Sequence, residues 1–280
     1  EPNRLLTISD AGGLPPLIKL ANVGTDGGKE KAAWALRHLA VDPDCQVAIA
    51  ANRGINPLVQ ALAMGNDAAQ VHASHALMTL AVNNPENQAQ IAKQLVLLLD
   101  HDDAGVVSRA ARDLQALARN NPGAPVVIVN AGAIMPLVSV LSNGKSELGR
   151  TEAAGTLAML ANSGPENQLA IAVGLVGLLG AGTDQAQEYV TELLLDLTSG
   201  SDSGSYANRR AIANAGPFKM LVFQLKSESM KVKQLAAAVM AELSGDAEEN
   251  VLEIAKVGGI PPLVSLLAVE DKRTREHAVL

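Results

Sequence analysis

Alanine-rich segments with leucines at positions i and i+3 recur along the chain. Leu36 and Leu39 form one such pair, and Leu77 and Leu80 form another. Residues three or four apart lie on one side of an α-helix, so each segment predicts a helix with a single buried face. The clearest copies are residues 32–40, 73–81, 110–118 and 153–161, with looser copies at 190–198 and 237–244.

A second recurring phrase is rich in glycine and proline and precedes most of these helices. It reads Gly-Gly-Leu-Pro-Pro-Leu-Ile at residues 12–18, and its other copies are residues 54–59, 132–138, 258–264 and, in degenerate form, 216–222. Glycine favours the left-handed end of a helix, and proline is tolerated in the first turn of the next one. Polar pairs that can cap the following helix come next: Asn66–Asp67, Asp102–Asp103 and Thr183–Asp184.

One leucine is shared by all copies of the phrase, and the separation between successive copies of this leucine gives the repeat length. It occurs as Leu17, Leu58, Leu95, Leu137, Leu175, Leu221 and Leu263, at separations of 41, 37, 42, 38, 46 and 42 residues. A period near 40 residues predicts stacked helical units.

The combination of this phrase with an Ala-Ala-Trp-Ala-Leu helix at residues 32–36 resembles the armadillo repeat. The resemblance extends over the whole chain. Among armadillo arrays, the chain is similar to the β-catenin-like and vacuole-associated adaptors. It implies an all-α fold, a right-handed superhelical solenoid with three helices per unit. We expect one array over residues 1–280, divided into about seven units at 1–41 (partial), 42–82, 83–119, 120–162, 163–205, 206–245 and 246–280 (partial). Because the helical pattern is already running at residue 1 and is still running at residue 280, we expect the chain to be an excerpt of a longer protein.

Two units, those of Leu95 and Leu175, lack the glycine–proline lead-in. Both follow a Pro-Glu-Asn-Gln sequence, at residues 85–88 and 165–168, so a block of two repeats looks duplicated. We expect the first two helices of these units to merge or shorten, with a local change in superhelical twist near residues 91–97 and 171–178. The serine- and glycine-rich residues 199–205 predict a mobile loop between units.

Composition excludes several classes of protein. Aromatic residues make up only 2% of the chain, which argues against an all-β fold, and the net charge of −7 gives no attraction to nucleic acid. The single cysteine, Cys45, excludes a disulfide framework and a cysteine-based zinc site. The longest apolar run, residues 169–182, is too short to cross a bilayer, so we expect no membrane insertion. We expect the protein in the cytoplasm, or in the cytoplasm and the nucleus.

No catalytic constellation emerges, so we predict that the chain is not an enzyme and needs no cofactor or metal. Residues 142–146 imitate the end of a phosphate-binding loop, but the required leading glycine is Ser139 and no strand precedes it. His72 and His75 are three residues apart on a predicted helix. We interpret them as a polar pair that faces a groove, and a pair of metal ligands is the alternative. Cys45 reads as a small structural residue rather than a reactive thiol.

The armadillo resemblance implies a binding surface along the third helix of each unit, where a Trp and, four residues later, an Asn hold a peptide. The Trp position reads Trp34, His75, Arg112, Gly155, Glu192 and Ala238, and the Asn position reads His38, Thr79, Ala116, Met159, Asp196 and Glu242. Only Trp34 keeps the pattern. This loss argues against the importin-α mode, in which repeated Trp–Asn pairs capture basic nuclear-localisation peptides.

We predict instead a scaffold or adaptor that holds a protein or peptide segment along the concave face. The predicted binding residues are Trp34, His38, His75, Thr79, Arg112, Glu188, Glu192, Asp196 and Glu242. The acidic residues of the second half, spaced four apart on one helix, indicate either a solvated face or a site for a basic segment. The alternative function is substrate recognition within a larger enzyme such as a U-box ubiquitin ligase, and the third is nuclear import. Oligomeric state is left open.

Overall fold

A computed structural model describes residues 11–180, 183–201, 203–245, 247–269 and 271–279. These residues form 18 α-helices, and no strand occurs among them. The all-α prediction is therefore confirmed. The helices divide into two compact units, residues 1–136 (unit 1) and 137–280 (unit 2), with the cut inside one helix.

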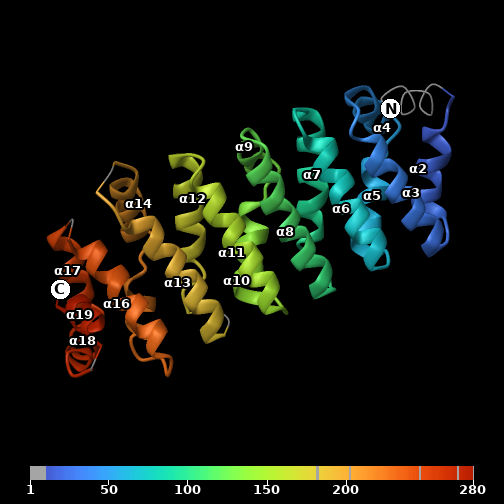
Figure 1. The fold of residues 1–280 in the computed structure, drawn as a ribbon. Coiled ribbons are helices and arrows are strands. Elements are labelled where there is room, and N and C mark those ends of the chain that lie inside the picture. Colours follow the sequence, from blue (N-terminus) through green and yellow to red (C-terminus); the bar gives the residue numbers. More distant parts are fainter. Residues whose placement is uncertain (1–10, 181–182, 202, 246, 270, 280) are drawn as a thin grey trace. The chain divides into compact units, whose positions relative to one another are not determined.

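Unit 1 contains eight complete helices and the start of a ninth (Figure 1). They are α2 (Leu14–Val23), α3 (Asp26–Leu39), α4 (Pro43–Ala51), α5 (Ile55–Met64), α6 (Asp67–Ala81), α7 (Pro85–Leu98), α8 (Ala104–Asn120), α9 (Ala124–Asn130) and α10 (Ile134–Asn143), which continues into unit 2.

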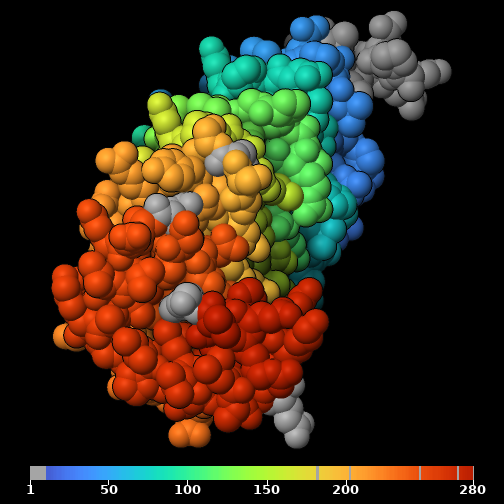
Figure 2. Space-filling view, turned by 90° about the vertical axis from the view of Figure 1, so that its left-hand side faces the viewer, coloured from blue at the N-terminus to red at the C-terminus, as the bar shows by residue number. Residues whose placement is uncertain are grey.

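Unit 2 continues with nine further helices in the same style. They are α11 (Glu147–Ala161), α12 (Pro165–Val176), α13 (Asp184–Thr198), α14 (Ser203–Asn214), α15 (Phe218–Gln224), α16 (Met230–Ser244), α17 (Glu248–Lys256), α18 (Ile260–Leu266) and α19 (Lys272–Ala278). Figure 2 shows the face of unit 2 on which its last helices, in orange and red, gather.

Nine of the described helices begin at a polar residue whose side-chain oxygen accepts a hydrogen bond from the backbone N–H three residues later, and seven of these nine occupy equivalent places in successive repeats. This bond satisfies one of the unpaired N–H groups at the start of a helix. We call these seven helices the third helices: α3, α6, α8, α11, α13, α16 and α19, capped by Thr25, Asn66, Asp103, Ser146, Thr183, Ser229 and Asp271. The predicted caps Asn66, Asp103 and Thr183 are confirmed.

The glycine–proline phrases form tight turns immediately before short helices. Each turn holds one residue in the left-handed region, which costs a residue with a Cβ about 1–2 kcal/mol. These residues are Gly12 (φ 74°), Gly132 (82°), Gly216 (75°), Gly258 (81°) and, unusually, Arg53 (60°). At Gly54 the reason for glycine is space instead, since a Cβ there would lie 2.6 Å from Ile49 Cγ2.

Equivalent helices of successive repeats pack against each other within each unit. In unit 1, α6 contacts both α3 and α8, while in unit 2 α13 contacts α11 and α16, and α16 contacts α19. The i and i+3 leucines predicted to face inward do so: Leu36, Leu77 and Leu80 are fully buried. Alanines on the same helices are buried too, and their small side chains allow the close approach of neighbouring helices.

The two units without a glycine–proline lead-in have two helices instead of three. One uninterrupted helix, α7, covers residues 85–98, and one, α12, covers residues 165–176. The predicted merging of the first two helices is therefore confirmed. Without the left-handed residue, nothing interrupts the backbone hydrogen bonds of the helix. The change in twist stays a prediction.

Buried amide side chains join successive repeats, a feature that the sequence analysis did not anticipate. Gln88 donates from Nε2 to the Ala81 carbonyl at 2.8 Å and to Asn121 Oδ1 at 3.2 Å. Gln46 likewise donates to the carbonyls of Ala40 (3.0 Å) and Thr79 (3.2 Å). Further amide groups bond to carbonyls at the ends of third helices: Asn87 to Leu80, Asn167 to Leu160, Asn208 to Leu197 and Asn250 to Leu243.

The connection after α13 differs from the predicted loop at residues 199–205. Residues 203–205 already belong to α14, and the Ser205 side chain is buried. Ser205 Oγ donates to the Ser199 carbonyl at 3.1 Å, which ties the start of α14 back to the end of α13. The prediction of a loop through residue 205 is therefore wrong, because this hydrogen bond favours an earlier helix start.

No single helix among the described residues is long and apolar enough to span a membrane, although α9 and α10 pass that test together as a pair bent by 79°.

Candidate functional site

The caps place the predicted binding residues in a common register. The residue at the Trp position lies nine residues after its cap, as in Thr25 to Trp34 and Asn66 to His75, and the residue at the Asn position lies thirteen after it. Five of the six Trp-position residues are exposed or half-buried, and only Ala238 is buried. All Asn-position residues are exposed or half-buried. The predicted residues therefore lie on the surface of the third helices.

In unit 1 the predicted residues form a row, the unit 1 row, over α3, α6 and α8: Trp34, His38, His75, Thr79 and Arg112. Trp34 is 49% exposed, and its ring lies 4.4 Å from that of His38, centroid to centroid, tilted by 58°. Thr79 Oγ1 donates to the His75 carbonyl at 2.7 Å, so its hydroxyl is engaged within its own helix.

Positive groups surround His75. Partial burial, followed by the charges of Arg37 and His72, holds the pKa of the His75 imidazole below its ordinary value. Arg37 makes no hydrogen bond or ion pair within the described ranges, whereas the nearby carboxylates have partners. Glu30 pairs with Lys31 at 3.1 Å, and the buried Asp113 accepts from Ser74 Oγ at 3.0 Å. The face around the unit 1 row is therefore cationic and aromatic.

In unit 2 a cavity of about 440 Å³ opens between α13, α16 and α19. We call it the α13–α16–α19 cavity. Glu192 and Asp196 line one wall, Lys231 and Gln234 come from α16, and Arg273 and His277 come from α19. Leu195, Leu235 and Ala238 supply apolar surface. The small Ala238 stands at the register position that Trp34 occupies in unit 1, which helps to leave this space open.

The three acidic residues of α13 differ in their partners. Glu188 Oε1 accepts from Ser229 Oγ at 2.8 Å, and Glu192 lies 3.5 Å from Lys231 Nζ. Asp196 has neither a hydrogen bond nor an ion pair to any other described residue. Burial, followed by the charge of Glu192, raises the pKa of the Asp196 carboxyl. Its negative charge is therefore the least compensated of the three, and a cation placed beside it would be stabilised.

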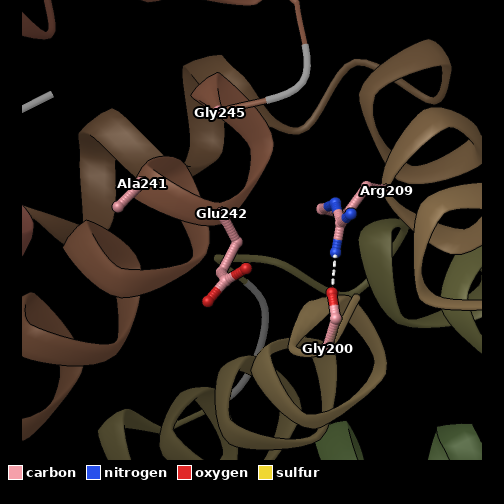
Figure 3. Close-up of a pocket in the computed structure, with 5 residues that line it drawn as sticks. All are labelled: Gly200, Arg209, Ala241, Glu242 and Gly245. Carbon is pink, nitrogen blue, oxygen red and sulfur yellow. Dashed lines mark hydrogen bonds between the residues drawn. The ribbon is translucent and has the colours of Figure 1, made fainter. Parts of the chain in front are cut away.

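Glu242 lies apart from these residues, in a smaller cavity of about 280 Å³ that it shares with Gly200, Arg209, Ala241 and Gly245. Figure 3 shows its carboxylate pointing into this cavity, and a hydrogen bond from Arg209 to the Gly200 carbonyl. Arg209 is buried and also donates to the Thr198 carbonyl at 2.7 Å. The structure thus groups Glu192 with Asp196 around one cavity and places Glu242 in another.

The weaker chemical candidates fall into structural roles. Cys45 is fully buried, and its backbone N–H donates to the Asp42 cap at 2.9 Å. Residues 142–146 span the end of α10 and the cap of α11 rather than a phosphate loop. Within the described part of the chain, no group of three or more His, Cys, Asp or Glu side chains is arranged to hold a metal ion.

Sequence reasoning missed the basic wall of the α13–α16–α19 cavity. Arg273 and His277 lie on α19, a short helix in a unit that was expected to be partial. Lys231 lies two residues after the Ser229 cap, outside the two register positions taken from the armadillo pattern. If the position two residues after each cap had been included with the other two register positions, it would have identified Lys231.

Comparison with known sequences supports the repeat assignment. The family described as Armadillo/beta-catenin-like repeat matches residues 1–41 and 247–280. A curated relative, U-box domain-containing protein 3 of Arabidopsis thaliana, is 51% identical over 59 residues. That match covers 21% of this chain and only 8% of the length of the relative.

Solved structures match over a much larger part of the chain. An engineered protein aligns with a TM-score of 0.58 and 30% identity, over 99% of this chain and 69% of its own. A designed armadillo repeat protein, solved in complex with the peptide (KR)4, aligns with a TM-score of 0.56 and 22% identity. It covers 80% of this chain and 96% of its own, and at this identity it supports the fold alone.

Proposed function

Because the chain belongs to the armadillo-repeat family, we propose that it is a non-enzymatic scaffold that holds a segment of a partner polypeptide on its third helices. In unit 2 the segment places a lysine or arginine in the α13–α16–α19 cavity. A designed armadillo repeat protein was solved with the basic peptide (KR)4, so an array of this fold can hold a basic segment.

Asp196 is the observation that carries this proposal. Asp196 is exposed, its carboxyl pKa is raised by desolvation and by the charge of Glu192, and it has no counter-ion among the described residues, so a cation that pairs with it is stabilised. The aliphatic part of a lysine or arginine would cover the apolar surface of Leu195, Leu235 and Ala238, while its charged end reaches Asp196. The cavity of about 440 Å³ has room for such a side chain.

The test measures binding of a fluorescently labelled, arginine- and lysine-rich peptide to the full chain by anisotropy. Asp196→Asn should weaken binding by roughly fivefold to tenfold, as expected for a partly exposed charge pair. Glu249→Gln, which removes the same charge from an exposed position on α17, should leave the affinity unchanged. If both variants bind like the parent, or if an uncharged peptide of equal length binds as well, the proposal is wrong.

A second candidate is substrate recognition within a larger ligase, favoured by the 59-residue match to a U-box protein. Under this hypothesis the same surfaces hold the substrate, and the catalytic domain lies elsewhere in the protein. A ubiquitin-transfer assay with the full-length protein decides: transfer that depends on Asp196 supports the ligase, and binding without transfer supports the plain scaffold. Nuclear import is the weakest candidate, because the Trp–Asn pairs are missing. We propose the cytoplasm, or the cytoplasm and the nucleus, as the location, and imaging of a tagged full-length protein tests it.

A further inference from the structure

The unit 1 row presents cationic side chains, whereas the α13–α16–α19 cavity presents the Asp196 carboxylate, which has no partner among the described residues. Its helices α3, α6 and α8 expose Trp34, His38, His75 and Arg112, and Arg37 lies close enough to His75 to repel its positive charge. The Arg112 side chain is 52% exposed, although its Nε lies 3.9 Å from the buried Asp113 carboxylate. This leaves most of the guanidinium accessible to a ligand.

The carboxylates near the row do not neutralise it. Glu30 is held by Lys31 at 3.1 Å and by Asn66 Nδ2 at 3.3 Å, at the edge of the row. Asp113 is 2% exposed and is engaged by Ser74. Arg37 has no carboxylate partner in the ranges that the structure describes. Because Asp113 is buried and Glu30 pairs with Lys31, the exposed charge of the row is positive and attracts anions, despite the negative net charge of the whole chain.

Trp34 supplies an apolar contact on α3, the same helix as Arg37. Half of its surface is open, and the His38 ring lies beside it at a tilt of 58°. An exposed tryptophan is typical of an interface anchor, because it contributes a large contact area with little loss of conformational freedom.

From this juxtaposition we propose that the face of Trp34, Arg37, His38, His75 and Arg112 binds a segment rich in aspartate and glutamate from a partner polypeptide. Carboxylates of the segment pair with Arg37 on α3 and with Arg112 on α8, and an apolar residue of the segment packs on Trp34. The proposal extends the proposed scaffold function to a second site of opposite charge preference. This proposal depends on the proposed scaffold function in one respect only: both take a polypeptide as the partner.

Trp34 is the sole tryptophan of the chain, so its fluorescence reports on this face and no other. The probe is a short peptide of alternating aspartate and leucine, titrated into the full chain. We expect a saturable change in Trp34 emission, and roughly tenfold weaker binding for the double variant Arg37→Gln/Arg112→Gln. The matched control, Lys19→Gln/Lys93→Gln, removes the same charge from exposed positions on α2 and α7 and should bind like the parent.

Each result has a defined meaning. Equal weakening by the control pair, or an equal emission change with a lysine–leucine peptide, would overturn the proposal. Equally tight binding of a DNA oligonucleotide would overturn it too, since the surface would then be a general anion site. Asp196→Asn should leave this titration unchanged, so that loss of the basic-peptide site and loss of the acidic-peptide site remain separate outcomes.

Discussion

Replacing Gln88 with methionine tests whether buried amides hold successive repeats together. Gln88 is 6% exposed, and its Nε2 donates both to the Ala81 carbonyl and to Asn121 Oδ1. Methionine has a similar length and shape but no donor, so Gln88→Met removes the two hydrogen bonds while largely conserving the packing. Two neutral hydrogen bonds contribute about 1 kcal/mol each, and acceptors left unsatisfied in the interior add a further penalty. We expect a loss of about 2–3 kcal/mol in the free energy of unfolding.

Urea denaturation followed by Trp34 fluorescence is the appropriate assay, because Trp34 and Gln88 both belong to unit 1. The expected loss lowers the urea midpoint by about 1 M or more for a unit of this size. Gln90→Met is the matched control, since Gln90 lies on the same helix, is half-buried and makes no side-chain hydrogen bond to the described residues. A midpoint for Gln88→Met equal to that of the Gln90→Met control would refute the reasoning.

Four further predictions concern single positions. Arg53→Gly, at the left-handed φ of 60°, should stabilise the chain by about 0.5 kcal/mol, whereas Gly258→Ala at 81° should cost about 1 kcal/mol; urea midpoints check both signs. Because the pKa of His75 is lowered on folding, the free energy of unfolding should fall as the pH drops from the ordinary histidine pKa to the lowered pKa of His75. The difference between the free energies of unfolding measured at about pH 8 and at about pH 5 should therefore be smaller in His75→Gln than in the parent. Because the pKa of Asp196 is raised, folding is penalised above that pKa, so Asp196→Asn should melt at a higher temperature than the parent at neutral pH while binding the basic peptide less tightly.

The fold was largely predictable because two local signals repeat and agree. The i and i+3 leucines identified the buried faces, and Leu36, Leu77 and Leu80 are indeed fully buried. The glycine–proline phrases identified the turns, and the loss of that phrase correctly predicted the single helices α7 and α12. Both signals depend on backbone geometry and burial, which sequence patterns record directly.

The sequence analysis recognised the Pro-Glu-Asn-Gln sequences only as a duplication. In the structure, the Asn and Gln of residues 85–88 bond to the end of the preceding third helix, and Gln88 also reaches the next repeat at Asn121. This role was not predictable from spacing, because the acceptors are backbone carbonyls and a residue 33 positions away. The start of α14 was missed for a similar reason, since the bond from Ser205 to Ser199 overrides the loop-forming composition.

The positions that make the fold and the positions that choose a partner are different residues of the same helix. Caps and leucines place the residue nine positions after the cap at the surface in five of six repeats, whatever its type. That position is Trp34 in an aromatic, cationic face, Glu192 in an acidic wall and Ala238 where a cavity opens. If a partner binds at these positions as proposed, substitutions there should change the ligand at little cost to folding, because the buried face is untouched. The family pattern therefore predicts where a partner binds, and only the charge and volume found at each position indicate which partner it is.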